Sequence, residues 1–197
     1  MYEAAACLAK YLESDEFELN RGGAERATFS GRRVVELGAG TGVVGIMASY
    51  LGASVVVTDL DSLVPLLDHN INQNNRMISA GTGSISARPL CWGTEPDADL
   101  FHPHFLILAN CIYYESSLEM LLETVLTLTS AGRSQTVILA CYEERTKEIR
   151  ELVCRWHAML DQYFTIHDVE RDILDAKYRQ DYIRVVKMLC RSRQQEN

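Results

Sequence analysis

The chain has 197 residues, of which 47% are hydrophobic and 23% are charged, and this composition fits one globular domain with a substantial core. Its formal net charge of −8 disfavours a function based on uniform electrostatic attraction to nucleic acid. The sequence shows no secretory signal and no apolar run that approaches the length of a transmembrane helix. We expect a monomeric, cytoplasmic, single-domain protein without a membrane or nucleic-acid partner.

The predicted elements begin with a helix over 3–13, because apolar residues recur there along one helical face. A polar loop with a glycine pair extends over 14–32, a core covers 33–189, and a flexible tail covers 190–197. Within the core, short β-branched runs predict strands, and longer stretches with helical spacing predict helices. The expected strands cover 33–38, 54–59, 84–90, 104–110, 135–142, 163–169 and 181–189. The expected helices cover 43–52, 62–75, 118–128 and 145–161.

The alternation of strands and helices predicts an α/β fold with a doubly wound, mostly parallel, seven-stranded sheet. The last two strands have no helix between them, so we expect them to pair antiparallel, with the last strand reversed. Ligands of such sheets bind at the carboxyl ends of the parallel strands. Gly38, Asp59 and Asn110 each stand at such an end, and the fold would bring them together.

The cysteines and the paired histidines do not form a recognisable metal or disulfide pattern. Six cysteines are scattered without a C-x-x-C motif, and they favour small buried side chains in a reducing compartment. They are Cys7, Cys91, Cys111, Cys141, Cys154 and Cys190. The segment "FHPHF" offers His102 and His104, but no third ligand is nearby, so a turn before a strand is expected and no metal site is predicted.

The stretch "VVELGAGTGVVG", residues 34–45, places glycines 38, 40 and 42 where the first strand turns into a helix. Glycines allow a tight turn and a close approach of the backbone to a ligand, and the helix N-terminus presents N–H groups to an anion. A dinucleotide fingerprint would need glycine at Val43. With Glu36 ahead of the turn, the pattern suits a ligand that carries both an ammonium and a carboxylate.

Two further residues have the positions of nucleoside contacts. Asp59 ends the second strand, about twenty residues beyond the glycine turn, where a carboxylate can accept both hydroxyls of a ribose. Trp92, in "LCWG", follows the third strand, where its indole could stack on an adenine; core packing is the alternative. The pattern therefore predicts an adenosine-containing ligand without deciding which one.

These residues, together with "KYLE" (10–13), "CIYYE" (111–115) and "CYEERT" (141–146), resemble the seven-β-strand methyltransferases that use S-adenosylmethionine. Within that class the chain is similar to the protein-lysine methyltransferases of the methyltransferase-like 21 group. The resemblance implies a Rossmann-like fold, S-adenosylmethionine as cofactor and transfer of a methyl group to a protein lysine. It also implies a protein substrate, an AAA ATPase of the valosin-containing type.

The resemblance also implies roles for individual residues. The cofactor-binding positions are Tyr2, Glu36, Gly38, Ala39, Gly40, Asp59, Trp92 and Ala109. The substrate motif of the family, D-x-x-Y, falls on Asn110 and Tyr113, which become the catalytic candidates. The family has an acid where this chain has Asn110, and a tryptophan where this chain has Tyr2.

Asn110 leaves alternatives open. A neutral amide in place of the acid should weaken lysine binding by about 1–3 kcal/mol. The second hypothesis is therefore a catalytically weak or inactive cofactor-binding or protein-interaction module, which the short N-terminus also favours. A third is an amide or exocyclic-amine methyltransferase, which the Asn-x-x-Tyr spacing favours. In the simplest alternative, Asn110 caps a strand end and the tyrosines only pack.

Overall fold

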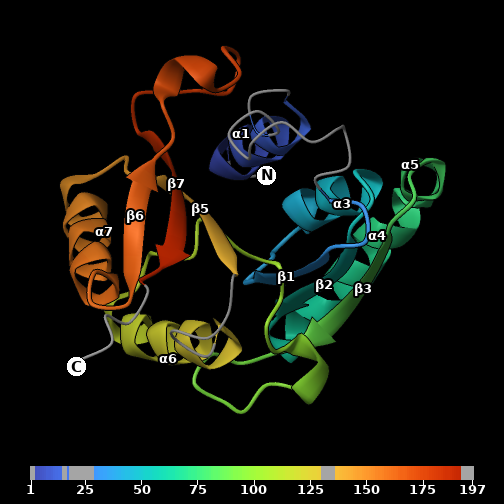
Figure 1. Cartoon of the computed structure of the whole chain (residues 1–197), viewed down its shortest axis with the longest axis horizontal. Helices are drawn as coiled ribbons and strands as arrows, with labels where there is room; N and C mark the ends of the chain where they lie inside the picture. The colour runs from blue at the N-terminus through green and yellow to red at the C-terminus, as the bar shows by residue number, and fades with distance from the viewer. Residues whose placement is uncertain (1–2, 15–16, 18–28, 130–135, 192–197) are drawn as a thin grey trace, which may run out of the picture.

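The structure, a computed structural model, describes residues 3–14, 17, 29–129 and 136–191, which build one seven-stranded sheet with helices on both faces (Figure 1). The strands are β1 (Arg33–Leu37), β2 (Ser54–Asp59), β3 (Ser84–Pro89), β4 (Phe105–Ala109), β5 (Val137–Glu143), β6 (Phe164–Asp168) and β7 (Ile183–Cys190). The helices are α1 (Glu3–Glu13), α3 (Val43–Tyr50), α4 (Val64–Gln73), α5 (Asn75–Ala80), α6 (Leu118–Thr129) and α7 (Lys147–Leu160).

The strand order is β3-β2-β1-β4-β5-β7-β6. The pairs β1·β2, β1·β4, β2·β3 and β4·β5 are parallel, whereas β7 lies antiparallel between β5 and β6. The doubly wound, mostly parallel sheet with a reversed last strand is therefore confirmed. The order reverses beside β1, because β2 lies on one side of β1 and β4 lies on the other. This switch point is where ligands of open α/β sheets bind.

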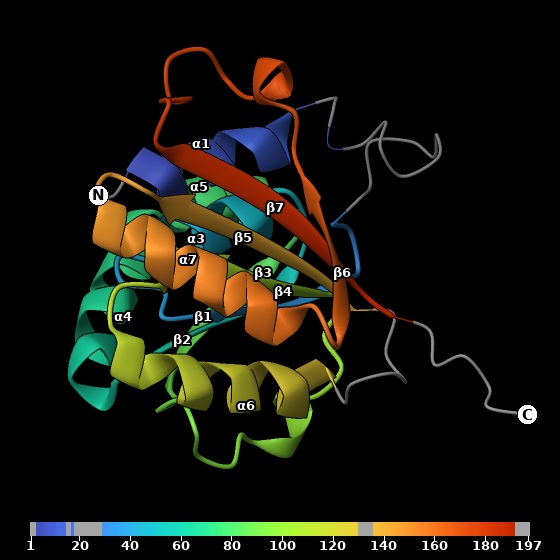
Figure 2. The same cartoon turned by 90° about the vertical axis from the view of Figure 1, so that its left-hand side faces the viewer.

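Each face of the sheet has its own apolar core. On one face, α1, α3 and α4 cover the sheet with buried residues such as Leu8, Val44 and Leu67, and α5 lies beside them. On the other face, α6 and α7 contribute Leu121 and Trp156 (Figure 2). The central strands β1, β4 and β5 are buried on both faces, and so they read in the sequence as continuous apolar runs.

The expected helix over 62–75 differs from the observed elements. The chain forms a single 3-10 turn over Asp61–Leu63, then α4, and then a separate α5. Asn74 separates the two helices with φ −99° and ψ 8°, and its side-chain amide donates to the carbonyl of Asn70 at 2.8 Å. The first helix thus ends at Gln73 rather than at 75, because the Asn74 side chain caps the Asn70 carbonyl and a new helix begins at once.

The cysteines also differ in part from expectation. Cys7, Cys111 and Cys141 are buried, but Cys91 and Cys154 are exposed, so the prediction that all six are small buried side chains is wrong for these two. The "FHPHF" segment is the predicted turn before β4.

In that turn His102 has φ 52°, and His104 accepts a hydrogen bond from the Arg33 amide through Nδ1 at 2.9 Å. Among the described residues, no three His, Cys, Asp or Glu side chains gather as a metal site. None of the helices in the described ranges is long and apolar enough to cross a membrane. Most of the expected loop over 14–32, and tail residues 192–197, lie outside the described residues.

Candidate active site

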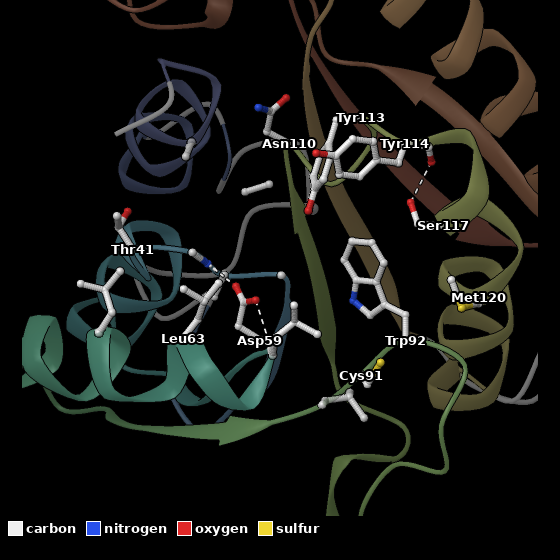
Figure 3. A pocket seen from close by; sticks show the side chains of 18 residues that line it. Thr41, Asp59, Leu63, Cys91, Trp92, Asn110, Tyr113, Tyr114, Ser117 and Met120 are labelled. Atoms are coloured by element: carbon white, nitrogen blue, oxygen red, sulfur yellow. Dashed lines mark hydrogen bonds between the residues drawn. The ribbon is translucent and has the colours of Figure 1, made fainter.

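A cavity of about 770 Å³ opens at the carboxyl ends of β1, β2 and β4 (Figure 3). Eight of the ten residues that the sequence singles out line it: Gly38, Ala39, Gly40, Asp59, Trp92, Ala109, Asn110 and Tyr113. The other lining residues are Ala5, Thr41, Leu60, Leu63, Leu66, Leu90, Cys91, Tyr114, Ser117 and Met120. The structure thus brings Gly38, Asp59 and Asn110 to one cavity, as the fold prediction required.

The glycine turn needs glycine for two separate reasons. Gly38, Gly40 and Gly42 have φ of 59°, 55° and 75°, a left-handed conformation that side chains with a Cβ disfavour. At Gly38 there is also no room, because a Cβ there would lie 2.9 Å from the Trp92 ring. The turn ends at Gly42, the N-cap of α3, whose φ of 75° leads the chain into the helix.

Glu36 lies beneath the turn and is 1% exposed. One of its oxygens, Oε2, accepts a hydrogen bond from the Gly45 amide at 2.8 Å, whereas the buried Oε1 has no hydrogen-bond partner among the described residues. Burial raises the pKa of Glu36 to about 8, with a smaller upward contribution from the charge of Asp59, and the Gly45 bond opposes the shift. A buried carboxylate oxygen without a donor is costly. Glu36 is not among the residues that line the cavity, so its predicted contact with a ligand ammonium stays a prediction.

Gly45 is a site residue that the sequence reasoning did not single out. A Cβ at this position would lie 2.3 Å from the Val57 side chain and 2.7 Å from Oε2 of Glu36. The absence of a Cβ therefore allows the first turn of α3 to approach β1 and hold the carboxylate. The signal was present, since Gly45 closes the acid-x-G-x-G-x-G-x-x-G stretch.

Asp59 ends β2 and is 9% exposed. Its Oδ2 accepts the Gly40 amide at 2.7 Å and its Oδ1 accepts the Leu60 amide at 2.8 Å. Asp59 therefore holds the glycine turn in place. A carboxylate has about four acceptor positions, so two backbone bonds leave capacity for ligand hydroxyls.

Aromatic side chains form one side of the cavity. Figure 3 shows Trp92, Tyr113 and Tyr114 on the side opposite Thr41 and Leu63. The two tyrosine rings meet edge to face, with centroids 4.8 Å apart and an interplanar angle of 72°. Trp92 contacts the glycine turn through its ring, as its closeness to Gly38 shows. A flat nucleobase would find an apolar wall at this position.

Asn110 follows β4 with φ 59°, a conformation that asparagine tolerates better than most residues. Its side-chain carbonyl accepts a hydrogen bond from the Glu143 backbone amide at 3.1 Å. The backbone amide of Asn110 donates to the Cys141 carbonyl at 2.9 Å. The strand-capping alternative is therefore correct as a description of these contacts. Oδ1 thus already accepts one hydrogen bond from β5, which leaves its second lone pair and the Nδ2 amide, a hydrogen-bond donor, for the cavity.

Glu143, which the sequence reasoning also did not single out, joins this tip to α1. Its side chain is buried, Oε1 accepts the Ala4 amide at 3.0 Å, and Oε2 lies 3.1 Å from Arg145 Nε. Arg145 also pairs with Glu3 at 3.0 Å. These contacts hold the start of α1 beside the cavity, where Ala5 lines it. Tyr2 lies outside the described residues, so its predicted cofactor contact stays a prediction.

Comparisons with known proteins agree with this geometry. The sequence profile of the family described as lysine methyltransferase matches residues 1–157. Protein N-lysine methyltransferase METTL21A of Xenopus tropicalis is 34% identical over 172 residues, covering 87% of this chain and 71% of that protein. METTL21A of Danio rerio is 32% identical over 177 residues, covering 88% and 73%.

Among solved structures, the fold is similar to magnesium protoporphyrin IX methyltransferase from Synechocystis with bound SAH. The TM-score is 0.59 at 13% identity, and the match covers 94% of this chain and 83% of that one. Most of the chain matches the family profile, and the cavity has a glycine turn and an acid at the end of β2. We conclude that the chain belongs to the lysine methyltransferase family and that it is a protein-lysine methyltransferase with S-adenosylmethionine as its cofactor.

Proposed function

We propose that this enzyme methylates a lysine of an AAA ATPase of the valosin-containing type. The observation that carries lysine methylation is the family match together with a cavity in which the glycine turn and the tip of β4 meet. The choice of target is supported by the segments "KYLE", "CIYYE" and "CYEERT", which resemble those of methyltransferases acting on such ATPases. We further propose that the enzyme works as a monomer in the cytoplasm.

The described residues fit the cofactor. The unpartnered Oε1 of Glu36 would receive its ammonium, and the turn around Gly38 and Gly40 would admit its methionine part. Asp59 would accept ribose hydroxyls and Trp92 would pack against the adenine. When bound, the cofactor supplies a methyl group that a sulfonium already activates, so the protein has to align and deprotonate the acceptor rather than form a covalent intermediate.

The protein's task is to present a neutral lysine amine. A free lysine has a pKa of about 10.4, and an apolar environment lowers it because the charged form loses its hydration. The aromatic wall and the leucines of the cavity supply this environment. The Tyr113 hydroxyl can accept a hydrogen bond from the amine and hold its lone pair toward the methyl group. Asn110 adds no negative charge to retain the proton.

A catalytically weak cofactor-binding module is the second candidate, and one observation favours it. The Asn110 carbonyl, the only acceptor on that side chain, already accepts the Glu143 amide and keeps one lone pair and no charge for a lysine ammonium. A carboxylate at this position would attract the ammonium more strongly. The same contact weakens the amide-methyltransferase hypothesis, which relied on that carbonyl as the acceptor for a substrate amide.

The test is to incubate the enzyme with labelled S-adenosylmethionine and a purified hexameric AAA ATPase of this type, and to map the label by mass spectrometry. We expect one labelled lysine, and we expect Asp59→Ala to abolish the labelling. If cofactor binds but neither this ATPase nor bulk cell protein is labelled, the weak-module candidate replaces the proposal. Labelling of other proteins but not of the ATPase would overturn the proposed target and leave the proposed methyl transfer intact.

A further inference from the structure

The mouth of the cavity is unusually apolar. Large hydrophobic side chains that are exposed in the described part of the chain number six, and five of them line this one cavity. These five, which we call the apolar rim, are Leu60, Leu66, Tyr113, Tyr114 and Met120, with exposed fractions between 43% and 66%. Apolar side chains gathered around an opening mark a surface that a partner covers.

The rim is built by two segments that face each other across the opening. Leu60 and Leu66 belong to the segment that runs from the end of β2 into α4, whereas the tyrosines and Met120 belong to the segment from β4 into α6. Figure 3 shows Leu63 of the first segment and Met120 of the second on opposite sides of the cavity. A chain that reaches the cavity must therefore pass between the two segments.

Charge is distributed unevenly between the part of the chain that carries the cavity and the C-terminal part. Residues 34–144, which include every lining residue except Ala5, contain 12 acidic and 3 basic residues. Residues 145–197 contain 9 acidic and 11 basic residues. The overall charge of −8 therefore comes from the part of the molecule that carries the cavity, and a basic partner would be attracted to this side of the enzyme.

Two acidic residues of the segment 34–144 are direct neighbours in sequence of rim residues. Asp61 follows Leu60 and Glu119 precedes Met120, so one acid stands on each side of the opening, and both are exposed. Neither forms an ion pair with another described residue. Glu115, which follows Tyr114, pairs with Arg155 instead. Asp61 and Glu119 are thus left to meet charges on a partner.

We infer that the rim docks a basic protein segment in which the target lysine is flanked by apolar residues and further lysines or arginines. The apolar flanks would cover the rim, and the flanking cations would meet Asp61 and Glu119. The same acids would repel the phosphates of a nucleic acid. This inference rests on the proposed lysine methylation, and it adds the class of segment that the site accepts.

The experiment uses two fluorescent peptides that share a central Leu-Lys-Leu, one with flanking arginines and one with flanking glutamates. Their binding is measured in the presence of S-adenosylhomocysteine, and methyl transfer is measured separately with S-adenosylmethionine. The arginine peptide would form two exposed ion pairs where the glutamate peptide would meet two like charges, so we expect the arginine peptide to bind about tenfold more tightly.

Charge-reversal variants distinguish the effect of the two acids beside the rim from the effect of the overall net charge. Asp61→Lys with Glu119→Lys should remove the preference, whereas the control, Glu151→Lys with Glu170→Lys, makes the same change in net charge at exposed positions away from the cavity and should keep it. Equal binding of the two peptides, no binding of either, or an equal loss in the control would overturn the inference.

The two readouts also separate this inference from the proposed function. A preference for the arginine peptide without any methyl transfer would support the docking surface and contradict methyl transfer to a lysine in such segments. Transfer to both peptides at equal efficiency would retain the function and remove the docking surface.

Discussion

The floor and the rim of the cavity are built in different ways. In the floor, Asp59 is nearly buried and accepts two backbone amides. Beneath the floor, the buried Glu36 accepts the Gly45 amide and leaves no space for a Cβ at that glycine. In the rim, Tyr113 and Tyr114 are 49% and 66% exposed, and their rings meet edge to face. A floor fixed by backbone geometry suits a cofactor of constant shape, whereas an exposed rim suits substrates that differ between relatives.

Gly45→Ala should produce the largest change, because it overpacks the floor. Its Cβ would meet Val57 and Glu36, and we expect a loss of about 3 kcal/mol in the free energy of unfolding, together with loss of cofactor binding. Urea denaturation measures the first effect and calorimetry the second.

The matched control is Gly40→Ala, where a Cβ would meet nothing within 4 Å and only the φ of 55° is unfavourable. It should lower stability by about 1 kcal/mol. Equal losses at the two glycines would show that close packing against Glu36 is not what the floor requires.

Asp59→Asn should have the next largest effect, on cofactor affinity. The amide can accept only one of the two backbone N–H bonds that Asp59 now accepts, and it carries no charge. We expect about 10- to 100-fold weaker cofactor binding by calorimetry. Asp61→Asn, at the exposed acid two residues on, should leave cofactor affinity unchanged, and a comparable loss there would argue against a specific role for Asp59.

The pH dependence of stability tests Glu36. Because burial raises its pKa to about 8 from an ordinary 4.5, the folded cofactor-free protein holds a proton between these values that the unfolded chain releases. Its stability should therefore fall as the pH rises from 4.5 toward 8, by up to about 1.4 kcal/mol per pH unit.

Cofactor affinity should change in the opposite direction over this range, since an ammonium favours the ionised carboxylate. Denaturation and binding measured at pH 5.5 and 7.5 should show both trends in the parent and neither in Glu36→Gln. If the pH profiles of the parent and of Glu36→Gln were parallel, a group other than Glu36 would be responsible for the pH dependence.

Asn110→Asp should have a smaller effect, confined to the substrate side of the cavity, which Asn110 lines together with Tyr113 of the rim. One carboxylate oxygen can keep the bond to the Glu143 amide while the other faces the cavity as a charged acceptor. The KM for a lysine substrate should fall about tenfold while cofactor affinity stays constant. Asn110→Ala is the control, because it loses the cap and should lower stability. If Asn110→Asp also shifts cofactor affinity, the floor and rim are not independent.

The floor could be predicted further from sequence than the rim. The glycine turn and the acid at the end of β2 are local in the chain, and their spacing alone places them at one sheet edge. The insertion of β7 between β5 and β6 depends on long-range pairing, which no local pattern encodes. Similarly, the contact between Asn110 and Glu143 joins residues 33 positions apart. The sequence therefore marked Asn110 as unusual without showing that its carbonyl is engaged.

The most direct test of the central claim is the chemical identity of the methylated residue. The enzyme is incubated with labelled S-adenosylmethionine and desalted bulk cell protein, and the labelled protein is hydrolysed to its amino acids. We predict that the label is recovered as methyl-lysine and that it is absent with Asp59→Ala. Recovery of the label in another amino acid, or no label while calorimetry shows bound cofactor, would contradict the assignment of this chain as a protein-lysine methyltransferase.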